Sequence, residues 1–279
     1  CEGALPGRSC GPQGRAGGVD LGRHAKTVPG PDGRDRRETG FYRTPGFVAD
    51  YLARRMLARR PVTRVFDPCV GDGAFLRPFL QQGVPAAGMD LYPSSHPAKV
   101  RFTQGDFLAF YEGWRRRGDD PLGHDAYVLN PPYNCHEVAY IRERKPRLQR
   151  LFPDIGAYNL YALFLAATVD LAAPGALVAC LTLDSFLTSR AHAPLRRRLL
   201  RDAIVHELRL CPTDLFRDQG ADVRTCLLLL EKRAAKLPAE APLPRERLVV
   251  RDRPVSTAAF RRSLGRDPSR RVALSQVVL

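Results

Sequence analysis

The feature that most constrains the fold is a series of short apolar runs between residues 41 and 232, separated by longer segments with helical spacing. Such alternation is typical of a mostly parallel sheet covered by helices on both faces. We therefore predict an α/β fold with a doubly wound, mostly parallel, seven-stranded sheet of the Rossmann-like type. The expected strands are 62–67, 85–91, 100–106, 125–130, 176–183, 204–210 and 224–232.

Two segments between these runs have apolar residues at helical spacing. Residues 45–60 begin at a proline, which is favoured in the first turn of a helix. Residues 158–175 end at Pro174-Gly175, which stops a helix. Little helical sequence separates the last two apolar runs, so we expect a late antiparallel strand.

The composition changes at both ends of this region. Residues 1–40 are rich in Gly, Pro and Arg and have no periodic apolar residues, so we expect a disordered tail. Residues 41–232 are expected to form one catalytic domain. Residues 233–279 have the Pro-rich character of a linker and are too few for another independent domain.

The charge balance indicates a polyanionic partner. The chain has 44 Lys and Arg against 29 Asp and Glu, a net charge of +15 and a pI near 10.0. We expect nucleic acid, although a solvated Arg-rich surface would carry the same charge. Two basic clusters could contact phosphates: residues 196–201, for which a solvated helix face is the alternative, and residues 140–150.

The cysteine spacing and the hydropathy indicate the cellular compartment. The seven cysteines have no C-x-x-C spacing, so neither a disulfide framework nor a zinc site is indicated. No apolar run is long enough to cross a bilayer. We therefore expect a protein of the reducing cytoplasm, with no metal and no membrane contact.

The first chemical motif is a glycine turn after the first expected strand. In VFDPCVGDGAFL the strand ends at Asp67, the turn contains Gly71 and Gly73, and a helix is expected directly afterwards. Glycines let the backbone approach a ligand, and a helix N-terminus favours an anionic group. A nucleotide-like ligand therefore fits. NAD does not, because Phe75 and Leu76 stand where a third glycine is needed.

The next two strands also end in carboxylates. Asp90 in GMDLY lies about twenty residues after the glycine turn, where a carboxylate can accept hydrogen bonds from both ribose hydroxyls. Asp106 in QGDFL ends the following strand. Ligands bind at the carboxyl ends of strands in such sheets, so three consecutive acidic strand ends predict an adenosyl site. Each carboxylate alone would be read as a cap or turn residue.

The fourth strand ends in Asn130-Pro131-Pro132-Tyr133 at the same edge. Proline fixes φ and holds the preceding residue extended, so this loop is expected to be a rigid set of outward acceptors. The Asn130 side-chain oxygen and the Pro131 carbonyl can accept both hydrogens of an exocyclic amino group, while Tyr133 offers a flat stacking face. The loop predicts a pocket for an aminated planar ring; a Pro-rich strand exit with a packing tyrosine is the alternative.

Together these motifs resemble those of S-adenosylmethionine-dependent DNA adenine-N6 methyltransferases of the gamma arrangement, which occur in restriction-modification systems. The resemblance covers roughly residues 38–232 and implies that residues 41–232 are the methyltransferase catalytic domain. Thr44-Pro45 in RRETGFYRTPGFVADYLARRM resembles the N-terminal motif that lies by the methionine part of the cofactor. In this group that motif precedes the glycine turn, as it does here.

The resemblance implies a role for each strand-end residue. In TDLFRDQGADVRTCLLLLEK it puts an aromatic that stacks on the target base at Phe216, where a core phenylalanine is the ordinary reading. The implied catalytic residues are Asn130, Pro131, Pro132, Tyr133 and Phe216. The implied S-adenosylmethionine-binding residues are Thr44, Pro45, Asp67, Gly71, Gly73, Asp90, Leu91, Asp106 and Phe107.

The implied function is methyl transfer from S-adenosylmethionine to the N6 amino group of a flipped adenine at a specific DNA site, in restriction-modification or phage defence. Asn130 and Pro131 would hold the amino group in line with the methyl group, without a covalent enzyme intermediate. The flipped base would stack between Tyr133 and Phe216. Two alternatives remain: methylation of a protein glutamine or an RNA base amino group, and a non-catalytic DNA-binding subunit.

DNA is therefore the expected partner, and the expected location is cytoplasmic and nucleoid-associated. Enzymes of this family usually continue into a large target-recognition domain. Residues 233–279 would then be a linker and the truncated start of a possible recognition region, or recognition would come from a separate subunit.

Overall fold

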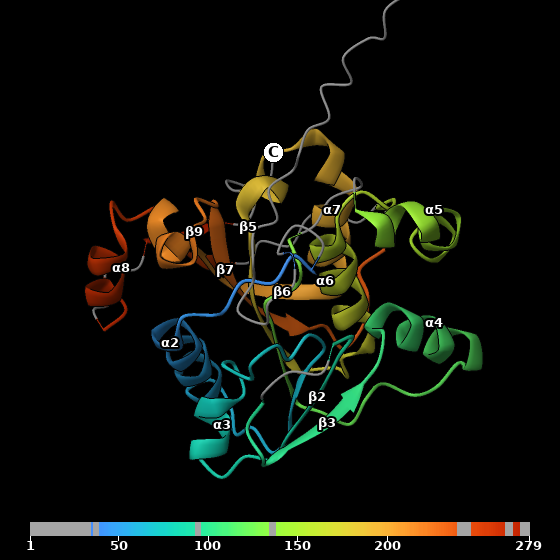
Figure 1. Ribbon diagram of the computed structural model, residues 1–279, viewed down its shortest axis with the longest axis horizontal. Helices are drawn as coiled ribbons and strands as arrows, with labels where there is room; N and C mark the ends of the chain where they lie inside the picture. Colours follow the sequence, from blue (N-terminus) through green and yellow to red (C-terminus); the bar gives the residue numbers. More distant parts are fainter. Residues whose placement is uncertain are drawn as a thin grey trace, which may run out of the picture.

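The computed structural model describes residues 35, 39–92, 96–133, 138–238, 247–265 and 270–273, and nine strands of this part form one sheet. Their order is β3-β2-β1-β4-β5-β7-β6-β8-β9 (Figure 1). All seven strands that the sequence predicts are present. The strands are β1 Val65–Asp67, β2 Ala86–Asp90, β3 Val100–Gln104, β4 Ala126–Leu129, β5 Leu177–Leu183, β6 Ala203–Leu210, β7 Thr225–Lys232, β8 Arg247–Arg251 and β9 Arg270–Ala273.

The strand directions match a mostly parallel sheet. β1 to β5 run parallel, whereas β7 is antiparallel to both of its neighbours, β5 and β6. The predicted late antiparallel strand is confirmed. Because β1, β2, β4 and β5 run in one direction and lie in register, their carboxyl ends meet at one edge.

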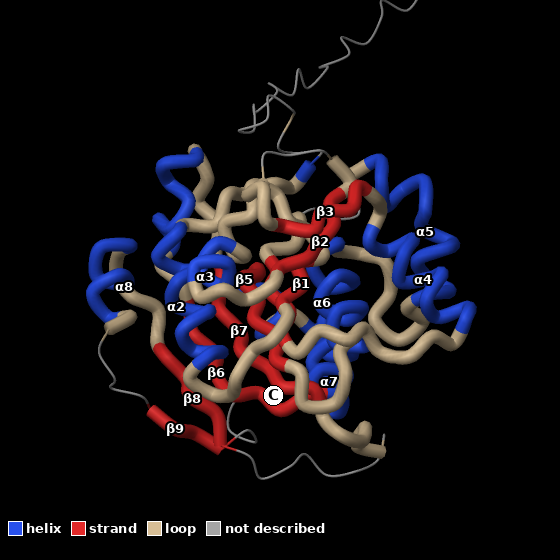
Figure 2. The backbone as a smooth tube through the Cα atoms, turned by 90° about the horizontal axis from the view of Figure 1, so that it is seen from below, coloured by secondary structure: helices blue, strands red, loops and turns tan. Residues whose placement is uncertain are grey.

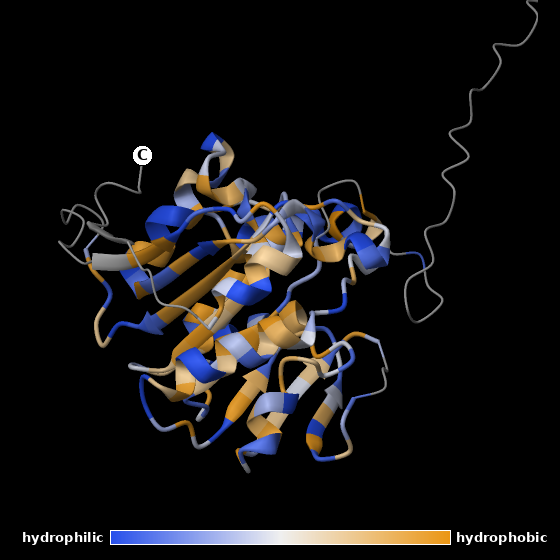
Figure 3. Ribbon diagram, turned by 90° about the vertical axis from the view of Figure 1, so that its left-hand side faces the viewer, coloured by the Kyte–Doolittle hydropathy of each residue, from blue (hydrophilic) through white to orange (hydrophobic). Residues whose placement is uncertain are grey.

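Helices cover both faces of the sheet (Figure 2). Helices α4 to α7 lie on one face, and α2, α3 and α8 lie on the other. β4 is buried along its whole length between them, which explains its continuous apolar sequence and the apolar centre in Figure 3. The helices are α2 Gly46–Leu57, α3 Arg77–Gln81, α4 Phe107–Arg117, α5 Ala139–Leu151, α6 Leu160–Leu171, α7 Ala193–Asp202 and α8 Thr257–Ser263, with 3₁₀ turns η1 Asp184–Leu187, η2 Arg190–His192 and η3 Thr213–Gln219.

The sheet crosses the domain boundary that the sequence predicts at residue 232. β8 pairs in parallel with β6, and β9 pairs with β8. On α8, the fully buried Phe260 lies with its ring 6.1 Å from that of Phe47 on α2. The guanidinium of Arg209 on β6 lies 5.1 Å from the centre of the Phe260 ring. Residues 247–265 therefore pack against the same core as the predicted catalytic domain.

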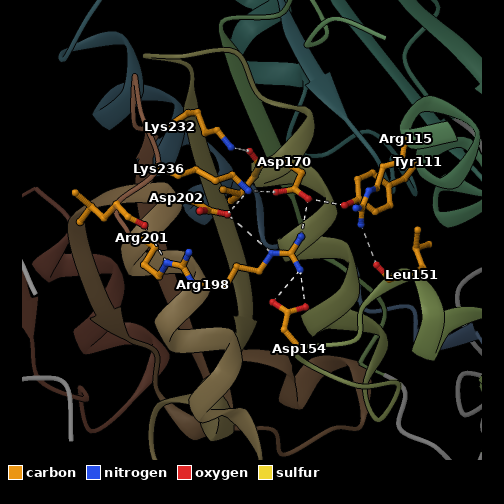
Figure 4. Close-up of polar contacts among 12 residues, drawn as sticks. Tyr111, Arg115, Leu151, Asp154, Asp170, Arg198, Arg201, Asp202, Lys232 and Lys236 are labelled. Atoms are coloured by element: carbon orange, nitrogen blue, oxygen red, sulfur yellow. Dashed lines mark hydrogen bonds and ion pairs between the residues drawn. The ribbon is translucent and has the colours of Figure 1, made fainter. Parts of the chain in front are cut away.

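An ion-pair network connects α7 with the end of α6 (Figure 4). Arg198, whose side chain is only 13% exposed, pairs with Asp170 at 2.6 Å and with Asp154 at 2.9 Å. Lys236 pairs with Asp202 at 3.1 Å. Burial opposes the ionisation of Asp170, but the charges of Arg198, Lys236 and Lys232 and the hydrogen bond from Tyr111 together outweigh it. The pKa of Asp170 therefore lies below its ordinary value. Arg198 and Lys236 thus share the two buried carboxylates, Asp170 and Asp202.

Within the described ranges, no helix is long and apolar enough to cross a membrane. The same residues include no group of three or more His, Cys, Asp or Glu side chains placed to hold a metal ion. Cys69, Cys180, Cys211 and Cys226 are free thiols. Burial raises the pKa of all four, so they remain protonated and act as small apolar side chains.

Candidate active site at the carboxyl edge of the sheet

Most of the predicted site residues gather where β1, β2 and β4 end. A pocket with an empty volume of about 710 Å³, part of it open to solvent, lies at this edge. The predicted residues that line it are Asp90, Leu91, Asp106, Phe107, Asn130 and Pro132. A smaller cavity that also contacts Asn130 is lined by Thr44 and Asp67. The predicted residues that line neither cavity are Pro45, Gly71, Gly73, Pro131, Tyr133 and Phe216.

The glycine turn follows β1 and lies next to the pocket. Gly71 and Gly73 have φ values of +51° and +73°, which non-glycine residues rarely adopt. A Cβ atom on Gly71 would come within 2.4 Å of the ring of Phe41, so glycine lets this ring close over the turn. The N–H of Gly71 donates to the Asp90 carboxylate at 2.9 Å. Helix α3 begins later than the sequence predicts, because the carbonyl of Gly73 first closes a further turn.

Asp67 lies beneath the turn with 1% of its surface exposed. Its carboxylate accepts a hydrogen bond from the N–H of Cys69 at 2.9 Å. Burial raises the pKa of Asp67 to about 8; the Cys69 bond opposes this shift, and the charge of Asp90 adds to it. Asp67 is therefore mostly protonated at neutral pH. A cationic ligand group in the adjacent cavity would favour its ionisation.

Asp90 and Asp106 are held in place by neutral donors. The Asp90 carboxylate accepts from the N–H groups of Gly71 and Tyr92, at 2.9 and 3.0 Å. Asp106 is the N-cap of α4 and accepts from two N–H groups of that helix, at 2.9 and 3.1 Å. The hydroxyl of Tyr140 on α5 also donates to Asp106, at 2.9 Å. Both carboxylates are thereby fixed at the pocket wall, where their remaining lone pairs can accept ligand hydrogens.

Beside Asp106 the pocket wall is apolar. Phe107 is 2% exposed, and its ring lies 5.1 Å from the ring of Phe164 on α6. Leu160 contributes to the same wall, and Leu91 lies 41% exposed at the other end of the pocket lining. Such a wall next to a fixed carboxylate suits a planar ring with an amino substituent.

Asn130 has a fixed orientation and one unused acceptor. Its side-chain nitrogen donates to the carbonyl of Tyr42 at 2.7 Å and to the hydroxyl oxygen of Thr44 at 3.0 Å. A backbone carbonyl only accepts, so the nitrogen must face this side. The side-chain oxygen of Asn130 is buried and has no hydrogen-bond partner among the described residues. An unpaired buried acceptor is costly, so this oxygen marks a place where a ligand donor fits.

Tyr133 and Phe216 lie together but do not present an open slot. Their ring centres are 6.2 Å apart and the rings are nearly perpendicular. The ring of Tyr42 stacks on Tyr133, with centres 5.3 Å apart and planes 27° apart, and it also contacts Phe216 at 5.3 Å. Phe216 is fully buried. In this conformation Tyr42 and Tyr133 lie against Phe216, so its ring presents no open face; that Phe216 stacks on a target base stays a prediction.

Several site residues lie outside the sequence prediction. Phe41 and Tyr42 come just before Thr44-Pro45, so two aromatics beside that motif were the available signal. Tyr140 lies in the segment 140–150, whose sequence predicts only a basic cluster. Gln219 exchanges two hydrogen bonds of 2.8 Å with the backbone of Arg43, across 176 positions of sequence. No local pattern predicts a contact at that separation.

The two basic clusters differ in their surroundings. Three arginines of the first cluster bind the protein itself: Arg198 pairs with carboxylates, and Arg196 and Arg201 donate to backbone carbonyls. Only Arg197 of this group is exposed. The cluster at 196–201 is therefore mainly structural. On α5 the exposed basic residues are Arg142, Lys145 and Arg150.

The strand order, the pocket at the carboxyl edge and the late antiparallel strand define the class I S-adenosylmethionine-dependent methyltransferase fold. A solved structure with this assignment from Listeria monocytogenes has a TM-score of 0.57 and 18% identity, over 81% of this chain and 71% of that one. A modification subunit assigned to a type I restriction enzyme of Vibrio vulnificus has a TM-score of 0.58 and 17% identity, over 87% and 57%.

The sequence comparisons point the same way. The family model described as N-6 DNA methylase matches residues 114–252 of this chain. The type II methyltransferase M.BanIII of Aneurinibacillus aneurinilyticus is 27% identical, over 65% of this chain and 37% of its own length. The chain thus spans little more than a third of this curated relative. The resemblance to restriction-modification DNA methyltransferases is confirmed at the family level.

Proposed function

We propose that this chain transfers a methyl group from S-adenosylmethionine to the N6 amino group of adenine in DNA. The observation that carries the proposal is the buried Asn130 oxygen without a partner among the described residues, at the end of β4 and beside the carboxylate-lined pocket. The family-model match over residues 114–252 supports the same reaction.

The residues of the pocket fit this cofactor. Asp90 would accept the ribose hydroxyls, and Asp106 with the apolar wall at Phe107 would hold the adenine ring. Thr44 and the protonatable Asp67 line the smaller cavity, where the cationic methionine part would lower the pKa of Asp67. The bound cofactor would supply an electrophilic methyl group on a sulfonium centre.

Asn130 and Pro131 would activate the target by position. The lone pair of the adenine amino nitrogen is delocalised into the ring, which makes it a weak nucleophile. Two acceptors, the Asn130 side-chain oxygen and the Pro131 carbonyl, would bind its two hydrogens and favour a tetrahedral nitrogen aimed at the methyl group. As the new N–C bond forms, the bond between the methyl carbon and the sulfonium sulfur would break with its electron pair left on sulfur, and the amino group would lose one proton to solvent. Thr44 and the Tyr42 carbonyl would keep the Asn130 oxygen pointed at the target.

Substrate selection is proposed to involve residues outside the described site. The solved relatives include modification subunits of type I restriction enzymes, and M.BanIII is far longer than this chain. We therefore propose site-specific methylation in a restriction-modification system, with recognition supplied by a further domain or a partner subunit. The exposed basic residues Arg142, Lys145 and Arg150 of α5 would contact DNA phosphates.

The reaction is tested by mass spectrometry of nucleosides after incubation of the protein with S-adenosylmethionine and unmethylated DNA. We expect N6-methyladenine with the unmodified protein and none with Asn130→Ala. RNA and cell-extract protein under the same conditions are the controls for substrate class. Methyl transfer to RNA or glutamine, but not to DNA, would contradict the proposal.

A further inference from the structure

The segment 40–44 crosses the Asn-Pro-Pro-Tyr loop as a strap (Figure 1, blue ribbon before α2). The carbonyl of Gly40 accepts from the N–H of Tyr133 at 3.2 Å, and the carbonyl of Tyr42 accepts from Asn130 at 2.7 Å. Arg43 is bound through its backbone by Gln219 and through its guanidinium by Asp72, at 3.0 Å. The strap backbone is therefore tied to three parts of the site.

The side chain of Tyr42 occupies the face of Tyr133 on which a base would stack. The ring planes are 27° apart, close to the parallel arrangement that a stacked nucleobase adopts. Phe216 lies 5.3 Å from the Tyr42 ring and 6.2 Å from the Tyr133 ring, so the three ring centres form a compact triangle. Tyr42 is half-buried, whereas Phe216 is fully buried.

We propose, on the basis of the methyl transfer proposed above, that Tyr42 is a positioning residue that fills the stacking place of the target base until a flipped base displaces it. Its carbonyl holds the Asn130 amide in both states, while its ring exchanges with the base on Tyr133. Aromatic pairs and base–aromatic stacks are of comparable strength, so this exchange is close to balanced. The ring thereby keeps the apolar site closed to water without a large barrier to the base.

The test compares two DNA probes of the same sequence: a duplex with adenine opposite an abasic site, in which the base leaves the stack readily, and the fully paired duplex. Affinities are measured by titration at one salt concentration. For Tyr42→Ala we expect the preference for the abasic probe to rise about 2- to 10-fold over the unmodified protein. Tyr42→Phe keeps the ring and should behave as the unmodified protein does.

Tyr42→Leu is the second variant, because it keeps apolar volume if the alanine variant does not fold. It should also raise the preference, since it cannot stack on Tyr133. An unchanged or lower preference for both variants would overturn the proposal, because a merely structural ring cannot oppose base binding. If the unmodified protein and both variants all bind the two probes equally, the base site itself is absent and the proposed function fails with it. The two failures are therefore distinguishable.

Discussion

Two groups of aspartates in this protein show how the same residue type serves structure in one place and a site in another. Asp170 is largely buried at the end of α6, and Arg198 and Lys236 neutralise it, so its pKa is lowered. Asp67 is buried at the end of β1 with only neutral donors described around it, and its pKa is raised to about 8. A buried carboxylate that is paired with a cationic side chain holds elements of the fold together. A buried carboxylate without such a partner can instead accept a positively charged ligand.

The largest effect on stability is expected where Arg198 pairs with buried Asp170. Arg198→Met leaves Asp170 and Asp154 without their shared partner and should lower the free energy of unfolding by about 3–5 kcal/mol. Urea titration measures this. Arg197→Met, one position away on the exposed face of α7, is the matched control and should stay within about 0.5 kcal/mol of the unmodified protein. Equal effects of both substitutions would contradict the contrast.

Asp67 is expected to lower the free energy of unfolding as the pH rises. Between the ordinary carboxyl pKa near 4 and the folded-state pKa of about 8, the folded protein holds one proton more than the unfolded chain at this residue. Stability contributed by Asp67 is therefore complete below pH 4 and falls by about 1.4 kcal/mol per pH unit up to pH 8. Asp67→Asn removes this loss. Thermal melts of the variant against the unmodified protein at pH 5 and 7 should diverge, and parallel curves would refute the assignment.

Asp170 should respond to pH in the reverse direction. Its folded-state pKa is lowered, so its stabilising contribution is present above pH 4 and is lost as the pH falls through the folded-state value. The difference in unfolding free energy between the unmodified protein and Asp170→Asn is expected to shrink on acidification. Urea titrations at pH 6 and pH 3 measure it, and a difference that grows on acidification would show that Arg198 does not control this carboxylate.

Among the aspartates of the candidate site, Asp90 is expected to contribute to the affinity for the cofactor. Asp90→Asn weakens the acceptor that the ribose hydroxyls would use and should reduce the affinity for S-adenosylhomocysteine about 10-fold. Calorimetric titration provides the measurement. Asp119→Asn, an exposed carboxylate after α4, serves as the control and should bind normally.

The smallest effect concerns DNA phosphates. Lys145→Gln on α5 should reduce the slope of log affinity against log salt by about 1, with little change in base preference. Arg198→Lys should leave the slope unchanged, since Arg198 is committed to Asp170. If Arg198→Lys, and not Lys145→Gln, reduced the slope of log affinity against log salt, the assignment of the two basic clusters would be reversed.

The sequence predicted the sheet and the strand-end residues because both follow from local patterns. Each predicted strand is an apolar run, and Asp67, Asp90 and Asn130 end three of them at one edge. The sequence pattern does not predict β8, because its short apolar run lies in a charged, Pro-rich segment. The Tyr42 ring and the Gln219 clasp on Arg43 were not predictable, since they depend on contacts across more than 90 and 170 positions.

The arginine cluster shows a different limit. A sequence shows that residues 196–201 form a basic cluster, but not that Arg198 faces two carboxylates from other segments, Asp154 and Asp170. Whether an arginine binds the protein or a partner depends on which charges the fold brings beside it. The roles implied for the site residues stay predictions, because geometry alone does not measure catalysis.

The measurement that tests the central claim most directly separates cofactor binding from methyl transfer in Asn130→Ala. Affinity for S-adenosylhomocysteine is measured by calorimetry, and N6-methyladenine formation by mass spectrometry, on the same preparations. We predict near-normal affinity and a loss of transfer of at least about 100-fold, because the Asn130 oxygen would act on the target amino group and not on the cofactor. Normal transfer by this variant would contradict the account.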